Sequence, residues 1–192
     1  NGTALLKVPY NVVVAKTPWR TLPIPIEIQR YLNEKTLSKS YWHQCAYGPN
    51  QLGVVQAVYR KQPESLNKSS VNSPAAVQWF IDQVPLKAGA RVLDLNTGTG
   101  VVARAAAKAG ASVVGTDISR HMIAYANAAS GGKIEYVRAS SQQLPLPDQS
   151  FDFVLSRLAF NHINERDAVL SEITRVLKPG GFVGIAERVF PA

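Results

Sequence analysis

The chain has 192 residues, 46% of them hydrophobic, and a formal net charge of +8. A chain of this length can bury the core of one domain, because domains near this size remove roughly 70% of their unfolded-chain surface from water. No apolar run reaches the ~18 residues that a transmembrane helix needs. Cys45 is the only cysteine of the sequence and the histidines lack ligand spacing, so we expect no internal disulfide and no metal site.

The positive charge is concentrated in the N-terminal third of the sequence. Residues 1–70 contain nine Lys and Arg against three Asp and Glu, a net charge of +6, whereas residues 71–192 contain twelve against ten, a net +2. Apart from Arg60 and Lys61, which follow Tyr59, these basic residues are spaced singly, which argues against nucleic-acid binding. We expect residues 1–72 to form a basic, aromatic-containing arm with one helix over 26–39. Such an arm is either solvated or lies on an acidic protein or membrane surface.

Strands and helices alternate through the rest of the chain. Ser73 followed by Pro74 is typical of a helix start, and it predicts a helix over Ala75–Val84. Near-continuous apolar strands such as 151–155 indicate a parallel sheet covered on both faces. We therefore predict an α/β, doubly wound, mostly parallel sheet of about five strands with helices on both faces, in a domain over residues 73–192. Its strands are expected near 91–95, 112–116, 134–138, 151–155 and 181–187, and its helices near 99–109, 119–129 and 165–177.

The first of these strands runs directly into a glycine-rich turn. Gly98 and Gly100 let the backbone turn sharply and approach a ligand closely, because neither carries a Cβ. The second strand ends at Asp117, and an acid at this place can accept hydrogen bonds from both hydroxyls of a ribose. The pattern predicts a nucleotide-type site at the C-terminal ends of the strands. The alternatives are a tight turn without a ligand and, for Asp117, a helix N-cap ahead of Ser119.

Two later stretches narrow the type of site. They are 140–152, with the sequence SSQQLPLPDQSFD, and 172–181, with the sequence EITRVLKPGG. With them, residues 73–190 resemble a class I S-adenosylmethionine-dependent methyltransferase, of the branch similar to the ubiquinone/menaquinone-biosynthesis and small-molecule methyltransferases. The resemblance implies a Rossmann-like fold, S-adenosylmethionine as cofactor and a small organic molecule as methyl acceptor.

The resemblance also implies roles for residues of the first motif. Asp94, Thr97, Gly98 and Gly100 belong to the motif whose loop wraps the methionine part of the cofactor. Asn96 stands where glycine or alanine is usual in the family. Because asparagine tolerates a positive φ better than other non-glycine residues, the turn itself is feasible.

Further cofactor contacts are implied after the second, third and fourth strands. Asp117 would accept hydrogen bonds from the ribose hydroxyls, and Ile118 would pack on the adenine. Ser140, followed by Ser141, stands where the family commonly has an acid for the adenine amino group, and the loss of that charge would weaken adenine recognition by about 1 kcal/mol. Ser156 opens the segment that faces the methionine end of the cofactor.

The same segment supplies a candidate catalytic residue. His162 would act as a general base toward an acceptor hydroxyl or acidic carbon, since a neutral imidazole works near pH 7. The alternative is that His162 caps the next helix or lines the cleft, because alignment of the reactants alone accelerates a transfer strongly. Arg157 would bind an acidic substrate or lie on the surface.

In the full methyltransferase fold, two more strands form a reversed hairpin beside the fifth strand, and this sequence ends before them. We expect an open sheet edge there, either through truncation or because another chain covers it. The edge and residues 1–70 are therefore the expected surfaces for a protein partner. A methyltransferase-like structural or interaction subunit of a larger assembly is the alternative function. The expected compartment is intracellular, either cytoplasmic or organellar after removal of a targeting segment.

Overall fold

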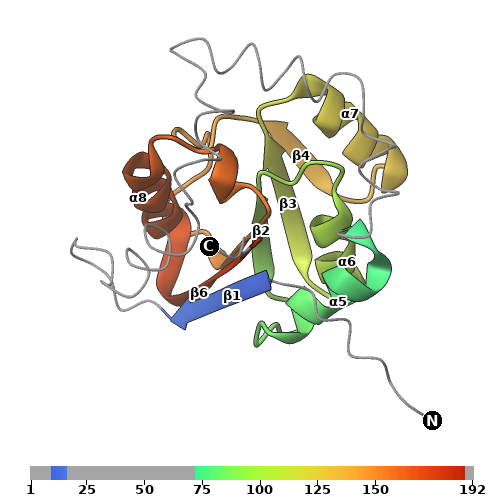
Figure 1. Ribbon diagram of the computed structural model, residues 1–192, viewed down its shortest axis with the longest axis horizontal. Coiled ribbons are helices and arrows are strands. Elements are labelled where there is room, and N and C mark those ends of the chain that lie inside the picture. Colours follow the sequence, from blue (N-terminus) through green and yellow to red (C-terminus); the bar gives the residue numbers. More distant parts are fainter. Residues whose placement is uncertain (1–9, 17–71, 189–192) are drawn as a thin grey trace.

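The computed structural model describes residues 10–16 and 72–188 (Figure 1). The predicted helix over 26–39 lies outside these residues. The described elements are, in chain order, β1 (Tyr10–Lys16), α5 (Pro74–Asp82), β2 (Arg91–Leu95), α6 (Val101–Lys108), β3 (Ser112–Asp117), α7 (Arg120–Ala129), β4 (Glu135–Arg138), β5 (Phe151–Arg157), the 3-10 helix η2 (Phe160–His162), α8 (Arg166–Val176) and β6 (Leu177–Arg188).

The described strands form one sheet in the order β1-β6-β5-β2-β3-β4. The strands from β2 to β6 are parallel, with Leu93 opposite Val114 on one side and opposite Val154 on the other. From β2 in the middle of the sheet, the chain builds one side through β3 and β4 and then crosses to the other side through β5 and β6. This arrangement confirms the predicted doubly wound α/β fold.

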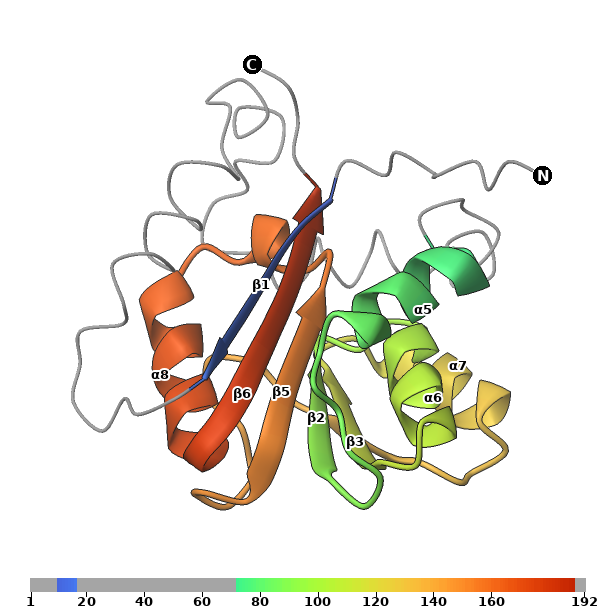
Figure 2. The same cartoon turned by 90° about the horizontal axis from the view of Figure 1, so that it is seen from below.

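The edge beside β6 is not open, contrary to the sequence-based expectation. β1 pairs with β6 in the antiparallel direction, from Tyr10 opposite Arg188 to Lys16 opposite Phe182. The two strands lie side by side in both ribbon views (Figures 1 and 2). β1 carries three consecutive valines, Val12–Val14, and β-branched residues favour extended backbone. The chain thus covers this edge itself, and a partner chain is not needed for that purpose.

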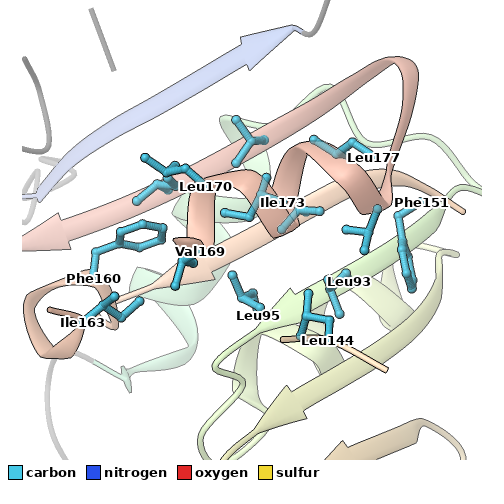
Figure 3. Packing of buried hydrophobic residues seen from close by; sticks show 14 of the residues in the cluster. Leu93, Leu95, Leu144, Phe151, Phe160, Ile163, Val169, Leu170, Ile173 and Leu177 are labelled. Carbon is cyan, nitrogen blue, oxygen red and sulfur yellow. The ribbon is translucent and has the colours of Figure 1, made fainter. Parts of the chain in front are cut away.

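Helices cover both faces of the sheet (Figure 2). On one face, α8 packs over a cluster of buried side chains that includes Leu93, Leu95 and Val154 (Figure 3). On the other face, α5 and α6 pack over Val92, Phe153 and their neighbours. Successive residues of β2 therefore point to opposite faces, and both faces are apolar, as expected of a central parallel strand.

Two helix starts follow from their sequences. The side chain of Ser73 accepts a hydrogen bond from Ala76 N (3.3 Å) at the start of α5, where Pro74 is the first helical residue. Ser119 plays the same part at the start of α7, where its hydroxyl accepts from Met122 N (3.4 Å). Across residues 10–16 and 72–188, no helix has the length and apolar character needed to cross a membrane.

Candidate functional site

The glycine-rich turn lies at the C-terminal ends of β2 and β3, which are neighbours in the sheet. Leu95 is opposite Thr116, so the turn after β2 and the acid that ends β3 are side by side. Three residues of the turn have a left-handed backbone: Asn96 with φ 57°, Gly98 with φ 54° and Gly100 with φ 76°. Asn96 therefore adopts the conformation that its side chain was expected to tolerate.

The two glycines of the turn serve different purposes. A Cβ on Gly100 would lie 2.6 Å from the hydroxyl oxygen of Tyr136 and 2.9 Å from the Cβ of Ala126, so a side chain has no room there. A Cβ on Gly98 would meet no atom within 4 Å. Gly100 is thus needed for packing against α7 and β4, whereas the backbone at Gly98 faces open space.

Asp94 anchors the turn through hydrogen bonds to its carboxylate. One carboxylate oxygen, Oδ2, accepts hydrogen bonds from the hydroxyl of Thr97 (2.5 Å) and from the backbone N–H of Ala103 (2.9 Å). The side chain is almost completely buried, and this burial raises the pKa of Asp94 to about 7 against the effect of the two hydrogen bonds. Asp94 therefore fixes the turn to the first turn of α6 and is covered by the protein around it.

Asp117 lies on the other side of the turn and is only half-buried as a residue. Its Oδ2 accepts from Gly98 N (2.9 Å) and its Oδ1 accepts from Ser119 N (2.8 Å). Burial of the carboxyl group raises the pKa of Asp117. The side chain of Ser119 caps α7, but Asp117 also satisfies the N–H of that capping residue, so the acid has a structural role beside its position at the turn.

The residues expected near an adenine lie next to Asp117. β4 ends beside β3, and Ala139 N donates to the carbonyl of Asp117 (3.0 Å). The carbonyl of Ile118 accepts from the Nε of Arg138 (3.1 Å). Ser140 begins a short turn in which its hydroxyl accepts from Gln142 N (3.3 Å). Ile118, Ser140 and Ser141 are all partly exposed at this edge of the sheet.

The predicted residues at the end of β5 and in the loop after it have different surroundings. Ser156 is completely buried, and its hydroxyl has no hydrogen-bond partner among the described residues. Arg157 is buried as well and donates to the side-chain oxygen of Asn72 (2.9 Å), so it is not a surface residue. His162 ends η2 and is exposed. Nearby residues of the same chain partly desolvate the ring of His162. This lowers the pKa of His162 and keeps the imidazole neutral at pH 7. The N-cap of α8 is Glu165, so His162 does not cap that helix.

One buried acid at the C-terminal ends of the strands, Glu187, was not predicted from the sequence to belong to the site. Glu187, at the end of β6, is almost fully buried, and its Oε1 accepts from Ala159 N (2.7 Å) and Phe160 N (2.8 Å). Burial raises its pKa to about 7. The available signal was an acid that ends an apolar strand at the same edge as Asp94 and Asp117. No group of three or more His, Cys, Asp or Glu side chains in the described residues is placed to hold a metal ion.

Comparison with known proteins identifies the family of this segment. Residues 93–185 match the family model described as a methyltransferase domain. A demethylmenaquinone methyltransferase of Clavibacter sepedonicus is 40% identical over 102 residues, which is 52% of this chain and 42% of the relative. The UbiE ubiquinone/menaquinone biosynthesis C-methyltransferase of Xanthomonas oryzae pv. oryzae is 35% identical over 119 residues, 57% of this chain and 47% of the relative.

A solved structure agrees with these relatives. The crystal structure of an S-adenosylmethionine-dependent methyltransferase from Mesorhizobium loti has a TM-score of 0.51 and 36% identity, over 55% of this chain and 51% of that one. The matched part of the chain thus spans about half the length, or slightly less, of these proteins. Together with the strand order and the acid–glycine turn, the matches show that residues 93–185 belong to the class I S-adenosylmethionine-dependent methyltransferases.

Proposed function

We propose that this protein binds S-adenosylmethionine and transfers its methyl group to a small organic acceptor. The observation that carries the proposal is the pair of acids on adjacent parallel strands, Asp94 and Asp117, which hold one glycine-containing turn between them. A turn fixed at both sides presents its backbone to a ligand without reorganisation when the ligand binds.

The residues fit this cofactor in two respects. Gly98 leaves open space above the turn, so a ligand can lie directly against the backbone. An ionised carboxylate offers about four acceptor positions, and the hydrogen bonds from Gly98 and Ser119 to Asp117 use two of them. Asp117 thus keeps acceptor capacity for ribose hydroxyls. Asn96 and Gly98 would face the methionine part, while Thr97 and Gly100 hold the turn in place. Ile118, Ser140 and Ser141 would face the adenine.

The bound cofactor would supply an electrophilic methyl group on a sulfonium sulfur. The contribution of the chain is to exclude water, align the acceptor and take up a proton where the acceptor loses one. His162 suits the last task because its imidazole is neutral and exposed. The names of the two relatives describe methyltransferases of quinone biosynthesis, which supports a small organic acceptor for this chain too.

The proposal is tested by transfer of label from S-adenosylmethionine that carries a tritiated methyl group. The acceptor panel contains naphthoquinols, benzoquinols and simple phenols. We expect label in the extracted small-molecule fraction for the wild-type protein and none for Asp117→Ala. Protein that binds the cofactor product but labels no member of the panel would contradict the proposed acceptor class.

A further inference from the structure

We propose that Glu187 is a positioning residue that holds the loop after β5, and with it His162, at the acceptor side of the site. The inference rests on the proposed methyl transfer for its purpose, but its geometry is independent of the cofactor. It concerns an acid at the end of β6 that faces the loop between β5 and α8.

The placement of Glu187 follows from the alternation of side chains along β6. Val183 and Ile185 point into the cluster beneath α8, and Glu187 is the next residue on that side of the sheet. A carboxylate in such a place is costly unless donors reach it. Here the backbone N–H groups of Ala159 and Phe160 reach the carboxylate, and both donate to the same oxygen, Oε1.

These two N–H groups follow a residue with an unfavourable backbone. Leu158 has φ 58°, a conformation in which a bulky side chain is a genuine outlier. Its own N–H donates to the carbonyl of Ala186 (2.8 Å), which continues the pairing of β5 with β6. The chain therefore leaves the sheet through a left-handed residue, and the next two N–H groups are fixed at once by Glu187. A strained conformation persists only where its surroundings determine it, and Glu187 supplies that restraint here.

The restraint reaches His162 through η2. His162 N donates to the carbonyl of Ala159 (2.9 Å), and Ile163 N donates to that of Phe160 (3.2 Å). The ring of Phe160 is completely buried in the cluster beneath α8, next to Ile163 (Figure 3). Glu187 fixes the backbone of Ala159 and Phe160 at the start of η2, and the ring of Phe160 anchors η2 to the core. The backbone position of His162 is then determined by both.

Geometry assigns this role to one carboxylate oxygen of Glu187, Oε1. Both hydrogen bonds, from Ala159 N and Phe160 N, use Oε1, so a glutamine with its amide oxygen in the same place retains both. Burial also raises the pKa of Glu187 to about 7, although the nearby Arg157 and Arg166 act in the opposite direction.

The test compares Glu187→Ala with Glu187→Gln and with the matched control Glu165→Ala. Glu165 is an exposed glutamate of the same segment, and its side chain makes no capping hydrogen bond. Hydrogen–deuterium exchange is measured at the amides of Ala159 and Phe160, and the pKa of His162 is measured by NMR titration. Titration with S-adenosylhomocysteine is run in parallel on every variant.

In Glu187→Ala we expect exchange at the two amides to become at least about tenfold faster and the pKa of His162 to rise toward 6.5. Glu187→Gln and Glu165→Ala should resemble the wild type in both measurements. If Glu187→Ala does not fold, Glu187→Asp replaces it, because its carboxylate is one methylene group shorter.

Wild-type exchange and an unchanged His162 pKa in Glu187→Ala would overturn the proposal. Equal effects of Glu187→Gln and Glu187→Ala would overturn the assignment to the oxygen atom. Failure of the wild-type protein to bind S-adenosylhomocysteine would count against the proposed function alone, because neither the exchange rates nor the histidine titration depends on the ligand.

Discussion

The site lies at the C-terminal ends of the parallel strands, and the two halves of this region use the same kind of contact. In the half formed by β2 and β3, Oδ2 of Asp94 accepts from Thr97 and Ala103. In the half formed by β5 and β6, Oε1 of Glu187 accepts from Ala159 and Phe160. Each buried acid uses one oxygen to fix the turn that follows a parallel strand. We propose that the first half is thereby organised for the cofactor and the second half for the acceptor.

The halves differ in how far apart the partners lie along the chain. Asp94 binds residues three and nine positions later, so acid, glycines and helix form one continuous pattern. Glu187 binds residues 28 and 27 positions earlier, with α8 between them. A contact between distant segments leaves no local spacing. This is why the sequence predicts the first half in detail and leaves the second half without its central acid.

The largest predicted effect is on the affinity for the cofactor product, which should differ between variants of the two halves. Asp117→Ala should weaken the binding of S-adenosylhomocysteine about 100-fold, since two charge-assisted hydrogen bonds contribute roughly 3 kcal/mol together. Glu187→Ala should change this affinity by no more than a few fold. Calorimetric titration measures both, with Asp148→Ala as control because Asp148 is an exposed acid. Unchanged affinity in Asp117→Ala would refute the ribose assignment.

The second prediction tests how the cofactor half is held together. Thr97→Val removes the hydroxyl that donates to Asp94 and should lower the free energy of unfolding by about 2 kcal/mol, because a buried acceptor loses a donor. Thr97→Ser keeps the hydroxyl and should lose much less. Urea denaturation measures the difference. Equal losses in the two variants would mean that the methyl group, and not the hydroxyl, matters at this position.

A pH dependence follows from the raised pKa of Asp94. This pKa is about 7 in the folded protein against 3.8 for an unperturbed aspartate, so the folded protein holds a proton that the unfolded chain releases between these values. The associated stability is fully present below pH 3.8 and is lost as the pH rises through 7. Glu187 contributes with the same sign.

The measurement is urea denaturation between about pH 5 and pH 8. In Asp94→Asn, the amide oxygen can accept both hydrogen bonds of Oδ2 while the titration is removed. The free energy of unfolding should therefore fall less with rising pH than in the wild type. Parallel curves for the two proteins would show that Asp94 does not titrate in this range.

The smallest predicted effect concerns two buried hydroxyls, one in each half. Thr116 Oγ1 and Ser156 Oγ have no hydrogen-bond partner in the described residues. Thr116→Val should raise the free energy of unfolding by about 1 kcal/mol, since an unsatisfied buried polar atom is removed. Ser156→Ala sharpens the comparison: weaker binding of S-adenosylhomocysteine supports its predicted cofactor contact, and unchanged binding assigns it to the core.

Much of the fold was predictable because it depends on local patterns. The apolar strands, the cap formed by Ser73 and Pro74, and the positive φ at Asn96 all follow from neighbouring residues. The left-handed Leu158 does not, because leucine carries no preference for that conformation. Nor does the pairing of β1 with β6, where the valines predict an extended segment but nothing nearby identifies its partner.

The most direct test is titration of the wild-type protein with S-adenosylhomocysteine by calorimetry, with NAD as the competing nucleotide. The product binds without an acceptor, and we propose that its binding depends mainly on the half organised by Asp94 and Asp117. We predict micromolar affinity for S-adenosylhomocysteine and none for NAD. Absence of binding at millimolar S-adenosylhomocysteine, in protein shown to be folded, would contradict the account and favour a structural subunit that retains the fold without the cofactor.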